Sequence, residues 1–197
     1  MSNEKTKTKL KITLNSPIIL VFVALCFIAT LLNYITNGAT NDFMFSTYRN
    51  SFLSPMTWIR SFTHVFGHAD WGHLVGNVSY LLLLGPMLEE KYKKSHLIEV
   101  IVITALITSL FNAAFFSTAH LCGASGVVFA FIMLSSFTSF REGELPITFI
   151  LVVLFFVGQQ IFEGVTSYNN ISYMAHIVGG IVGAVFGYLF NKRRAKS

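Results

Sequence analysis

The stretch Gly123-Ala124-Ser125-Gly126 opens an apolar segment that runs to Phe140. A serine in such a place usually hydrogen-bonds only to nearby backbone. A second apolar segment, however, contains Ala175-His176-Ile177-Val178-Gly179. An ionisable side chain inside a membrane span is costly, and by default it indicates a functional site with a partner. The two stretches therefore predict two membrane spans that bring Ser125 and His176 together.

The composition is that of a membrane protein. Of the 197 residues, 53% are hydrophobic, only 12% are charged and 20 are phenylalanine, and the mean hydropathy is +0.62. A soluble domain carries about a quarter charged residues. The two cysteines, Cys26 and Cys122, are too few for a disulfide framework, and Cys26 is expected to pack as a small apolar side chain. The basic residues flank the apolar segments without interleaved aromatics, so we expect no nucleic-acid binding.

The apolar segments predict an all-α membrane protein, a bundle of six transmembrane helices. The first segment is longer than the apolar centre of a signal peptide, which has about 7–15 residues, so we expect it to be retained as a span. Residues 37–70 are predicted to form a long loop with interfacial aromatic side chains. The predicted spans are residues 17–34, 71–88, 97–116, 125–140, 146–162 and 173–190, in a six-span domain at 17–191 between a basic N-terminus (1–16) and a basic tail (192–197).

The distribution of Lys and Arg predicts the orientation. If the N-terminus is inside, the inner segments hold every Lys and Arg except Arg49 and Arg60. Inner loops of membrane proteins carry an excess of these residues. Both termini are then cytoplasmic, which agrees with an even number of spans. This topology places Ser125 and His176 near the outer ends of the fourth and sixth spans, in a multi-pass protein of the cell membrane whose site opens to the extracytoplasmic side.

Small residues predict that the fourth and sixth spans pack closely. His176, Gly179 and Gly183 lie three and seven residues apart, so they share one helix face. Gly179 and Gly183 form a pair of small residues with three others between them, a spacing that lets helix backbones approach. Gly126 and Ala130 form a second such pair beside Ser125. Packing alone also accounts for these residues, but a close pair of helices is what a Ser–His hydrogen bond requires.

Serine is a weak nucleophile that needs a base, and His176 can take its proton and return it to a leaving amine. On the outer side the carboxylates are those of Asp42, Asp70 and Glu163, and none lies within the fourth or sixth span. We therefore predict a Ser125–His176 dyad with the imidazole held by packing. Phe129, one helical turn after Ser125, lies on the correct face to stack against it.

Two polar residues at the outer start of the second span are candidate oxyanion donors. His73 and Asn77 are four residues apart, so their imidazole and amide N–H groups share a helix face. Donors of this kind must be aimed in advance at the developing charge. The backbone N–H of Ser125, at a helix start, is a third candidate.

These stretches carry a resemblance to a known family. Gly123-Ala124-Ser125-Gly126, Ala175 to Gly183 and His73-Leu74-Val75-Gly76-Asn77 resemble the three signatures of the rhomboid intramembrane serine proteases. Arg60-Ser61-Phe62-Thr63-His64 with His68 is similar to that family's first outer loop, and Gly85-Pro86-Met87-Leu88-Glu89 to the inner end of its second span. The resemblance covers roughly residues 60–187.

The resemblance implies a six-helix bundle with a water-filled cavity open to the outside, and cleavage of a substrate's transmembrane segment near its outer end. It implies Ser125 as nucleophile, His176 as base and His73 with Asn77 as oxyanion donors. Gly123, Gly126, Gly179, Gly183 and Phe129 would support them, and Arg60, His64 and Glu89 would be structural. The expected partners are membrane protein substrates and lipid, with no cofactor, metal or nucleic acid. The chain departs from the family where it has Phe129 in place of a frequent Tyr, and Gly76 in place of a bulky residue.

Two alternatives remain at this point, and a third fails. His64 and His68, four residues apart, have the spacing of zinc ligands, although no Glu follows either in the His-Glu-x-x-His pattern. A non-catalytic chaperone or retention factor with the same bundle is the second, although such relatives usually lack the Ser or the His. Thiol chemistry at Cys122 is the third, and it lacks an assigned base.

Overall fold

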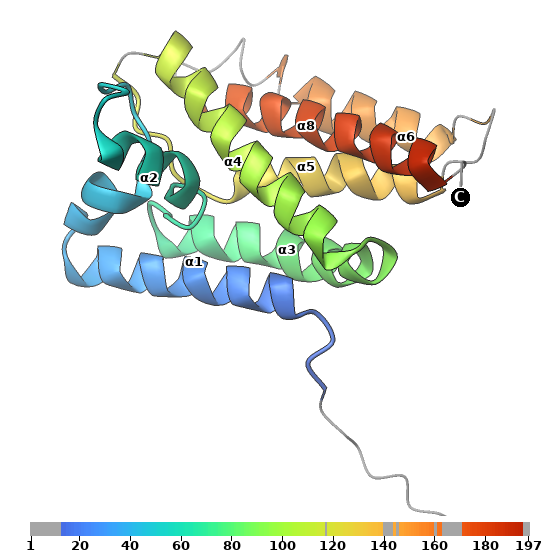
Figure 1. Cartoon of the computed structure of the whole chain (residues 1–197), viewed down its shortest axis with the longest axis horizontal. Coiled ribbons are helices and arrows are strands. Elements are labelled where there is room, and N and C mark those ends of the chain that lie inside the picture. The colour runs from blue at the N-terminus through green and yellow to red at the C-terminus, as the bar shows by residue number, and fades with distance from the viewer. Residues whose placement is uncertain are drawn as a thin grey trace, which may run out of the picture.

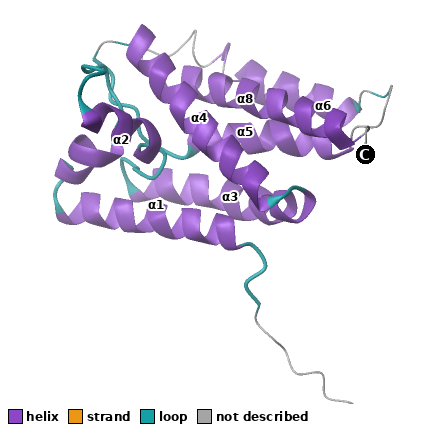
Figure 2. Ribbon diagram, viewed as in Figure 1, coloured by secondary structure: helices purple, strands orange, loops and turns teal. Residues whose placement is uncertain are grey.

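The computed structural model describes residues 13–116, 118–139, 144, 146–159, 161–162 and 171–194. Within these ranges the regular secondary structure is helical, apart from one isolated antiparallel bridge between Thr47 and Leu121 (Figure 2). The all-α prediction is therefore confirmed. The helices are α1 (Pro17–Ile35), α2 (Pro55–Thr63), α3 (Trp71–Lys91), α4 (Lys94–Phe115), α5 (Ser125–Ser136), α6 (Ile147–Val152) and α8 (Ile171–Arg194), with π-helical η1 (Asn41–Phe45) and η3 (Val153–Val157) and the 3₁₀ turn η2 (Phe137–Ser139).

Length and apolarity mark these helices as a membrane bundle. Among the described residues, Pro17–Ile35, Lys94–Phe115 and Tyr173–Lys192 are long and apolar enough to cross a membrane, and Ser125–Ser136 and Ile147–Phe156 are shorter apolar helices. α3 has 21 residues. Large apolar side chains, such as Ile28 on α1 and Leu83 on α3, are exposed on the outside of the bundle. Exposed apolar surface on this scale is suited to lipid.

The structure corrects several predicted boundaries. The predicted loop at 37–70 contains α2, which begins with Pro55 at a position where its missing N–H costs nothing. The fourth apolar segment leaves the α-helix at Ser136, where the hydroxyls of Ser135 and Ser136 donate to the Ile132 carbonyl. Its predicted end at residue 140 lies outside the described residues. The fifth segment changes from α6 to the π-helix η3, and α8 is longer than predicted at both ends.

α5 is the central helix of the bundle. It packs against α3, α4, α6 and α8, and it is buried along most of its length (Figure 1). α1 lies beside α3, and α4 crosses the bundle between the two groups of helices. α2 lies at the end of the bundle where α3, α5 and α8 begin, and we call this the α2 end. The core includes the fully buried side chains Phe131, Ile19, Leu81, Leu88, Leu97 and Leu134.

The predicted close approach of the fourth and sixth spans is confirmed. A Cβ atom added to Gly179 would lie 2.8 and 2.9 Å from the backbone C and Cα of Gly126. One added to Gly183 would lie 2.6 and 2.7 Å from the Cα and C of Ala130. Carbon atoms in contact are normally about 3.5–4.0 Å apart. The two glycines therefore set the distance between α5 and α8, and with it the distance between the segments that carry Ser125 and His176.

The other end of the bundle is fixed by a carboxylate. Glu89, near the end of α3, is 8% exposed. Its two oxygens accept hydrogen bonds from the backbone N–H groups of Ile18 (3.1 Å) and Ile19 (3.2 Å). The first N–H groups of a helix have no partner inside it and favour negative charge nearby. Glu89 thus caps α1 and holds it beside α3.

Candidate active site

A cavity of about 340 Å³ at the α2 end contains the predicted residues Ser125, His176, His73, Asn77 and Phe129. Four segments form its walls. The lining residues are Gly72, His73, Gly76, Asn77 and Tyr80 from α3; Ser125, Val128, Phe129 and Ile132 from α5; Phe156 and Gln159 from the fifth apolar segment; and His176 from α8. Its volume is in the range of small-molecule and substrate pockets.

Ser125 is the first residue of α5 and is half-buried. The chain enters the helix through Gly123, whose φ of +128° is a conformation that other residues rarely adopt. The Gly123 N–H donates to the His64 carbonyl (3.0 Å). A Cβ at this position would lie 2.7 and 2.9 Å from Cε1 and Nε2 of His73. Gly123 therefore lets the loop before Ser125 lie directly against His73.

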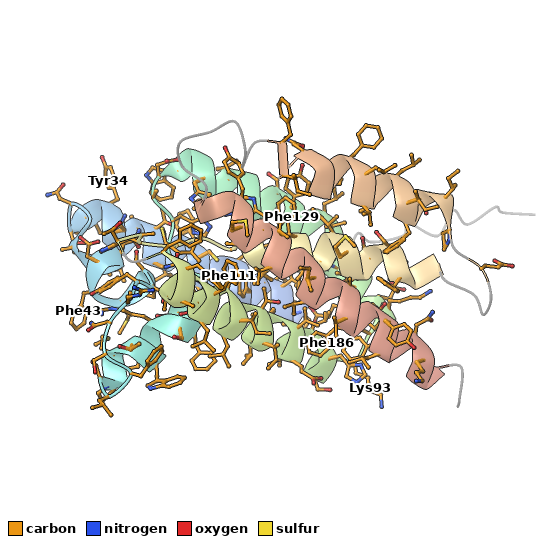
Figure 3. All side chains as sticks on the ribbon, turned by 90° about the horizontal axis from the view of Figure 1, so that it is seen from above. Tyr34, Phe43, Lys93, Phe111, Phe129 and Phe186 are labelled. Carbon is orange, nitrogen blue, oxygen red and sulfur yellow. The ribbon has the colours of Figure 1, made fainter. Side chains whose placement is uncertain are left out.

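His176 is half-buried on α8 between two aromatic rings. Its ring stacks on Phe129 with the centroids 4.5 Å apart and the planes 4° from parallel. Tyr173 lies edge-on at 6.4 Å. The predicted contact between Phe129 and the imidazole is present, and it fixes the plane in which the ring lies. Phe129 is labelled in Figure 3, where it lies beside α8.

The candidate oxyanion donors lie on the first turns of α3. Asp70 caps this helix, because its Oδ1 accepts a hydrogen bond from the His73 backbone N–H (2.8 Å). Asn77 is only 7% exposed, and its Nδ2 has no hydrogen-bond partner among the described residues. A buried donor without a partner is costly unless a ligand completes it. The arrangement can supply an amide N–H to an oxygen bound in the cavity.

Two of the three carboxylates expected on the same side of the membrane as His176 make other contacts in the structure. Asp70 caps α3, and Asp42 lies 3.3 Å from Nδ1 of His120. Glu163 lies outside the described residues. The ring contacts with Phe129 and Tyr173 help to orient the imidazole.

His64 and His68 are both buried side chains, and the ring of His68 lies edge-on to that of His73 with the centroids 5.0 Å apart. The ring nitrogens of His64 contact the Arg60 carbonyl (3.2 Å) and Oγ1 of Thr108 (3.3 Å), so both are occupied within the protein. Nδ1 of His68 contacts the Phe66 carbonyl (3.1 Å). Burial lowers the pKa of each imidazole to about 4, and both are neutral at pH 7. A zinc ion at this pair would have to displace the contacts of His64.

Cys122 lies just before Gly123, outside the helices. Burial raises the pKa of its thiol, an effect opposed by a hydrogen bond with Ser46. The thiol, rather than the thiolate, is then the species present at neutral pH, and only the thiolate is a strong nucleophile. This environment does not favour the thiol alternative.

Several lining residues were not predicted. Tyr80 lies three residues after Asn77, so the same helix-face argument that linked His73 and Asn77 also points to it. Gln159 is a polar residue in an apolar segment, a signal comparable to that of His176. Gly72 and Phe156 have no such signal, because small and aromatic residues are common throughout membrane helices.

Fold and cavity together define a helical membrane protein in which a serine and a histidine line one pocket with both polar and apolar walls. The rhomboid domain matches residues 55–193 of the chain. The chain belongs to the rhomboid family. It is 30% identical over 136 residues to Rhomboid-related protein 1 of Caenorhabditis elegans, covering 64% of this chain and 38% of the relative.

Two further relatives show how the lengths compare. Identity is 26% over 149 residues with Rhomboid-like protein 11, chloroplastic, of Arabidopsis thaliana, covering 68% of this chain and 53% of the relative. Identity is 25% over 187 residues with Rhomboid protease GlpG of Haemophilus influenzae, covering 91% of this chain and 94% of the relative. The chain thus spans about half or less of the first two relatives, and nearly all of the third.

Proposed function

We propose that this chain is an intramembrane serine endopeptidase that uses a Ser125–His176 dyad. The observation that carries the proposal is that both side chains line one cavity together with His73 and Asn77. Family membership and the similarity to a relative named a rhomboid protease support it. The substrate is the transmembrane segment of a membrane protein, because the cavity lies between helices whose outer faces are apolar.

The proposed reaction has two halves. Oγ of Ser125 attacks the scissile carbonyl carbon while His176 takes the proton of the Ser125 hydroxyl, and the carbonyl oxygen becomes an oxyanion. Nδ2 of Asn77, the His73 imidazole and the Ser125 backbone N–H donate to that oxygen. The intermediate collapses to an acyl-enzyme while His176 gives its proton to the leaving amine. Water then attacks the acyl carbon, with His176 again accepting and returning the proton to Ser125 Oγ.

The orientation follows from the distribution of basic residues. We place both termini in the cytoplasm, the six-span domain at residues 17–191 in the cell membrane, and the α2 end on the extracytoplasmic side. Cleavage then occurs near the outer end of the substrate's transmembrane segment. Neither a metal nor a cofactor takes part in the proposed steps.

The direct test is labelling of the purified protein with a fluorophosphonate, followed by mapping of the modified residue, together with cleavage of a model transmembrane substrate. We expect modification at Ser125 and loss of cleavage in Ser125→Ala and in His176→Ala. Ser135→Ala is a matched control on the same helix, because its hydroxyl only donates to the Ile132 carbonyl. Substrate turnover by Ser125→Ala at the wild-type rate would refute the serine mechanism.

A further inference from the structure

We propose that Asn112 is a positioning residue for the loop that precedes Ser125. It belongs to the last turn of α4 and is 2% exposed. Its Nδ2 donates to two backbone carbonyls, those of Thr47 (3.2 Å) and Ala119 (3.1 Å). Because both partners are acceptors, the NH₂ group must face them. One buried amide thus joins the first outer loop to the loop that leads into α5.

The amide extends a small backbone ladder. The N–H of Leu121 donates to the Thr47 carbonyl and the N–H of Thr47 to the Leu121 carbonyl, both at 2.9 Å. Two bonds alone form a minimal bridge, and isolated short pairings are weak. Asn112 adds one hydrogen bond to each of the two bridged segments. One goes to Thr47 itself, and the other goes to Ala119, two residues before Leu121. The register between the two loops is therefore held by four hydrogen bonds.

The bridge lies only two residues before Gly123, where the chain meets the candidate site. From Leu121 the chain passes through Cys122 to Gly123, which lies against His73 and is bonded to the His64 carbonyl. Ser125 and its backbone N–H follow at once. A shift of the loop would displace the nucleophile and one oxyanion donor together. Asn112 does not line the cavity, so its role is to position the loop and not to contact the reacting atoms.

A second buried polar contact on α4 provides a control. Ser109, one turn before Asn112, is also 2% exposed. Its hydroxyl lies 2.6 Å from Oγ1 of Thr47 and donates to that of Ser61 (2.9 Å). These contacts involve the side chain of Thr47 and not its backbone, and neither reaches residues 119–121. Ser109→Ala therefore removes a buried polar group from the same helix without touching the loop before Ser125.

The inference rests on the proposed function, and the test separates the two. Asn112→Asp keeps the shape of the side chain but replaces the two N–H donors with a carboxyl group. Asn112→Ala removes the group and is the variant to use if the first does not fold. Because a displacement of about 1 Å can cost roughly a hundredfold in rate, we expect kcat to fall by about tenfold to a hundredfold with KM little changed.

The deciding measurement is the rate at which a small fluorophosphonate modifies Ser125, at a temperature where thermal unfolding in detergent shows every protein folded. This probe needs the nucleophile and the oxyanion donors but not the substrate's helix. We expect its rate to fall with kcat in the Asn112 variants and to stay near the wild-type value in Ser109→Ala. Wild-type labelling by folded Asn112 variants, or an equal loss in Ser109→Ala, would overturn the inference. A wild-type protein that neither labels nor cleaves would refute the proposed function itself.

Discussion

Adding one methyl group to Gly179 should separate Ser125 from His176. The new Cβ of Gly179→Ala would lie 2.8 Å from the Gly126 backbone C and closer still to its carbonyl oxygen. Carbon contacts begin at about 3.5 Å, so α8 must move from α5 by roughly 0.7 Å or more. Because the obstacle is backbone, no side-chain rotation relieves it. The displacement acts three residues from His176, and we expect turnover to fall by about tenfold to a hundredfold.

The neighbouring glycine is a matched control for this prediction. A Cβ at Gly180 would meet only Cγ of Met133 at 3.5 Å, an ordinary contact. Both substitutions gain helix propensity of about 1 kcal/mol, so Gly180→Ala should be at least as stable as the wild type and fully active. Cleavage of a model transmembrane substrate and thermal unfolding would be measured in one detergent. Equal activity of the two variants would show that the α5–α8 distance does not control the dyad.

Four other predictions follow from the site. Phe129→Tyr should keep most activity because the ring face remains, whereas Phe129→Ala should lose much of it, with stability reduced by about 3–5 kcal/mol in thermal unfolding; full activity in the folded Ala variant would show that another group orients His176. Asn77→Ala should lower kcat by about tenfold or more with a smaller change in KM, since an oxyanion donor acts mainly in the transition state; a pure KM effect would contradict that role. Because burial lowers the pKa of His64 from 6.5 to about 4, the contribution of His64 to stability should be full above pH 6.5 and should decline by about 3 kcal/mol as the pH falls to 4, at about 1.4 kcal/mol per unit. His68, whose pKa is lowered in the same way, adds to the decline; His64→Gln should therefore lessen, without abolishing, the pH dependence of thermal unfolding. Activity should resist both EDTA and thiol alkylation. Inhibition by a chelator, reversed when metal is added, would favour the zinc alternative, and inactivation by alkylation of Cys122 alone would favour the thiol alternative.

The residues of the site were largely predictable because each carries a chemical signal against an apolar background. His176 in an apolar segment and the glycine pair beside it indicated both a base and a close helix contact. The spacing of Phe129 from Ser125 was enough to predict the ring contact, because residues four apart share a helix face. The catalytic roles of these residues stay predictions until the variants are measured.

Contacts between residues that are distant along the chain could not be predicted from the sequence. The segment that forms α2 mixes polar and aromatic residues, and the burial of its polar side chains Arg60 and Ser61 has no signal in the sequence. The bridge between Thr47 and Leu121 joins two segments without strand-like alternation. The π-helical η3 has no compositional mark, because its register depends on packing rather than on propensity.

The bond between Glu89 and the start of α1 sets an order for biogenesis. Ile18 and Ile19 are synthesised 71 and 70 residues before the carboxylate that accepts their N–H groups. Until α3 is complete, these donors depend on water or lipid headgroups at the membrane surface, because nothing inside α1 accepts from them. α1 and α3 therefore cannot reach their final pairing before residue 89 has been synthesised. Loss of the Glu89 carboxylate should appear as fewer inserted molecules in the membrane, and not as slower turnover by those that arrive.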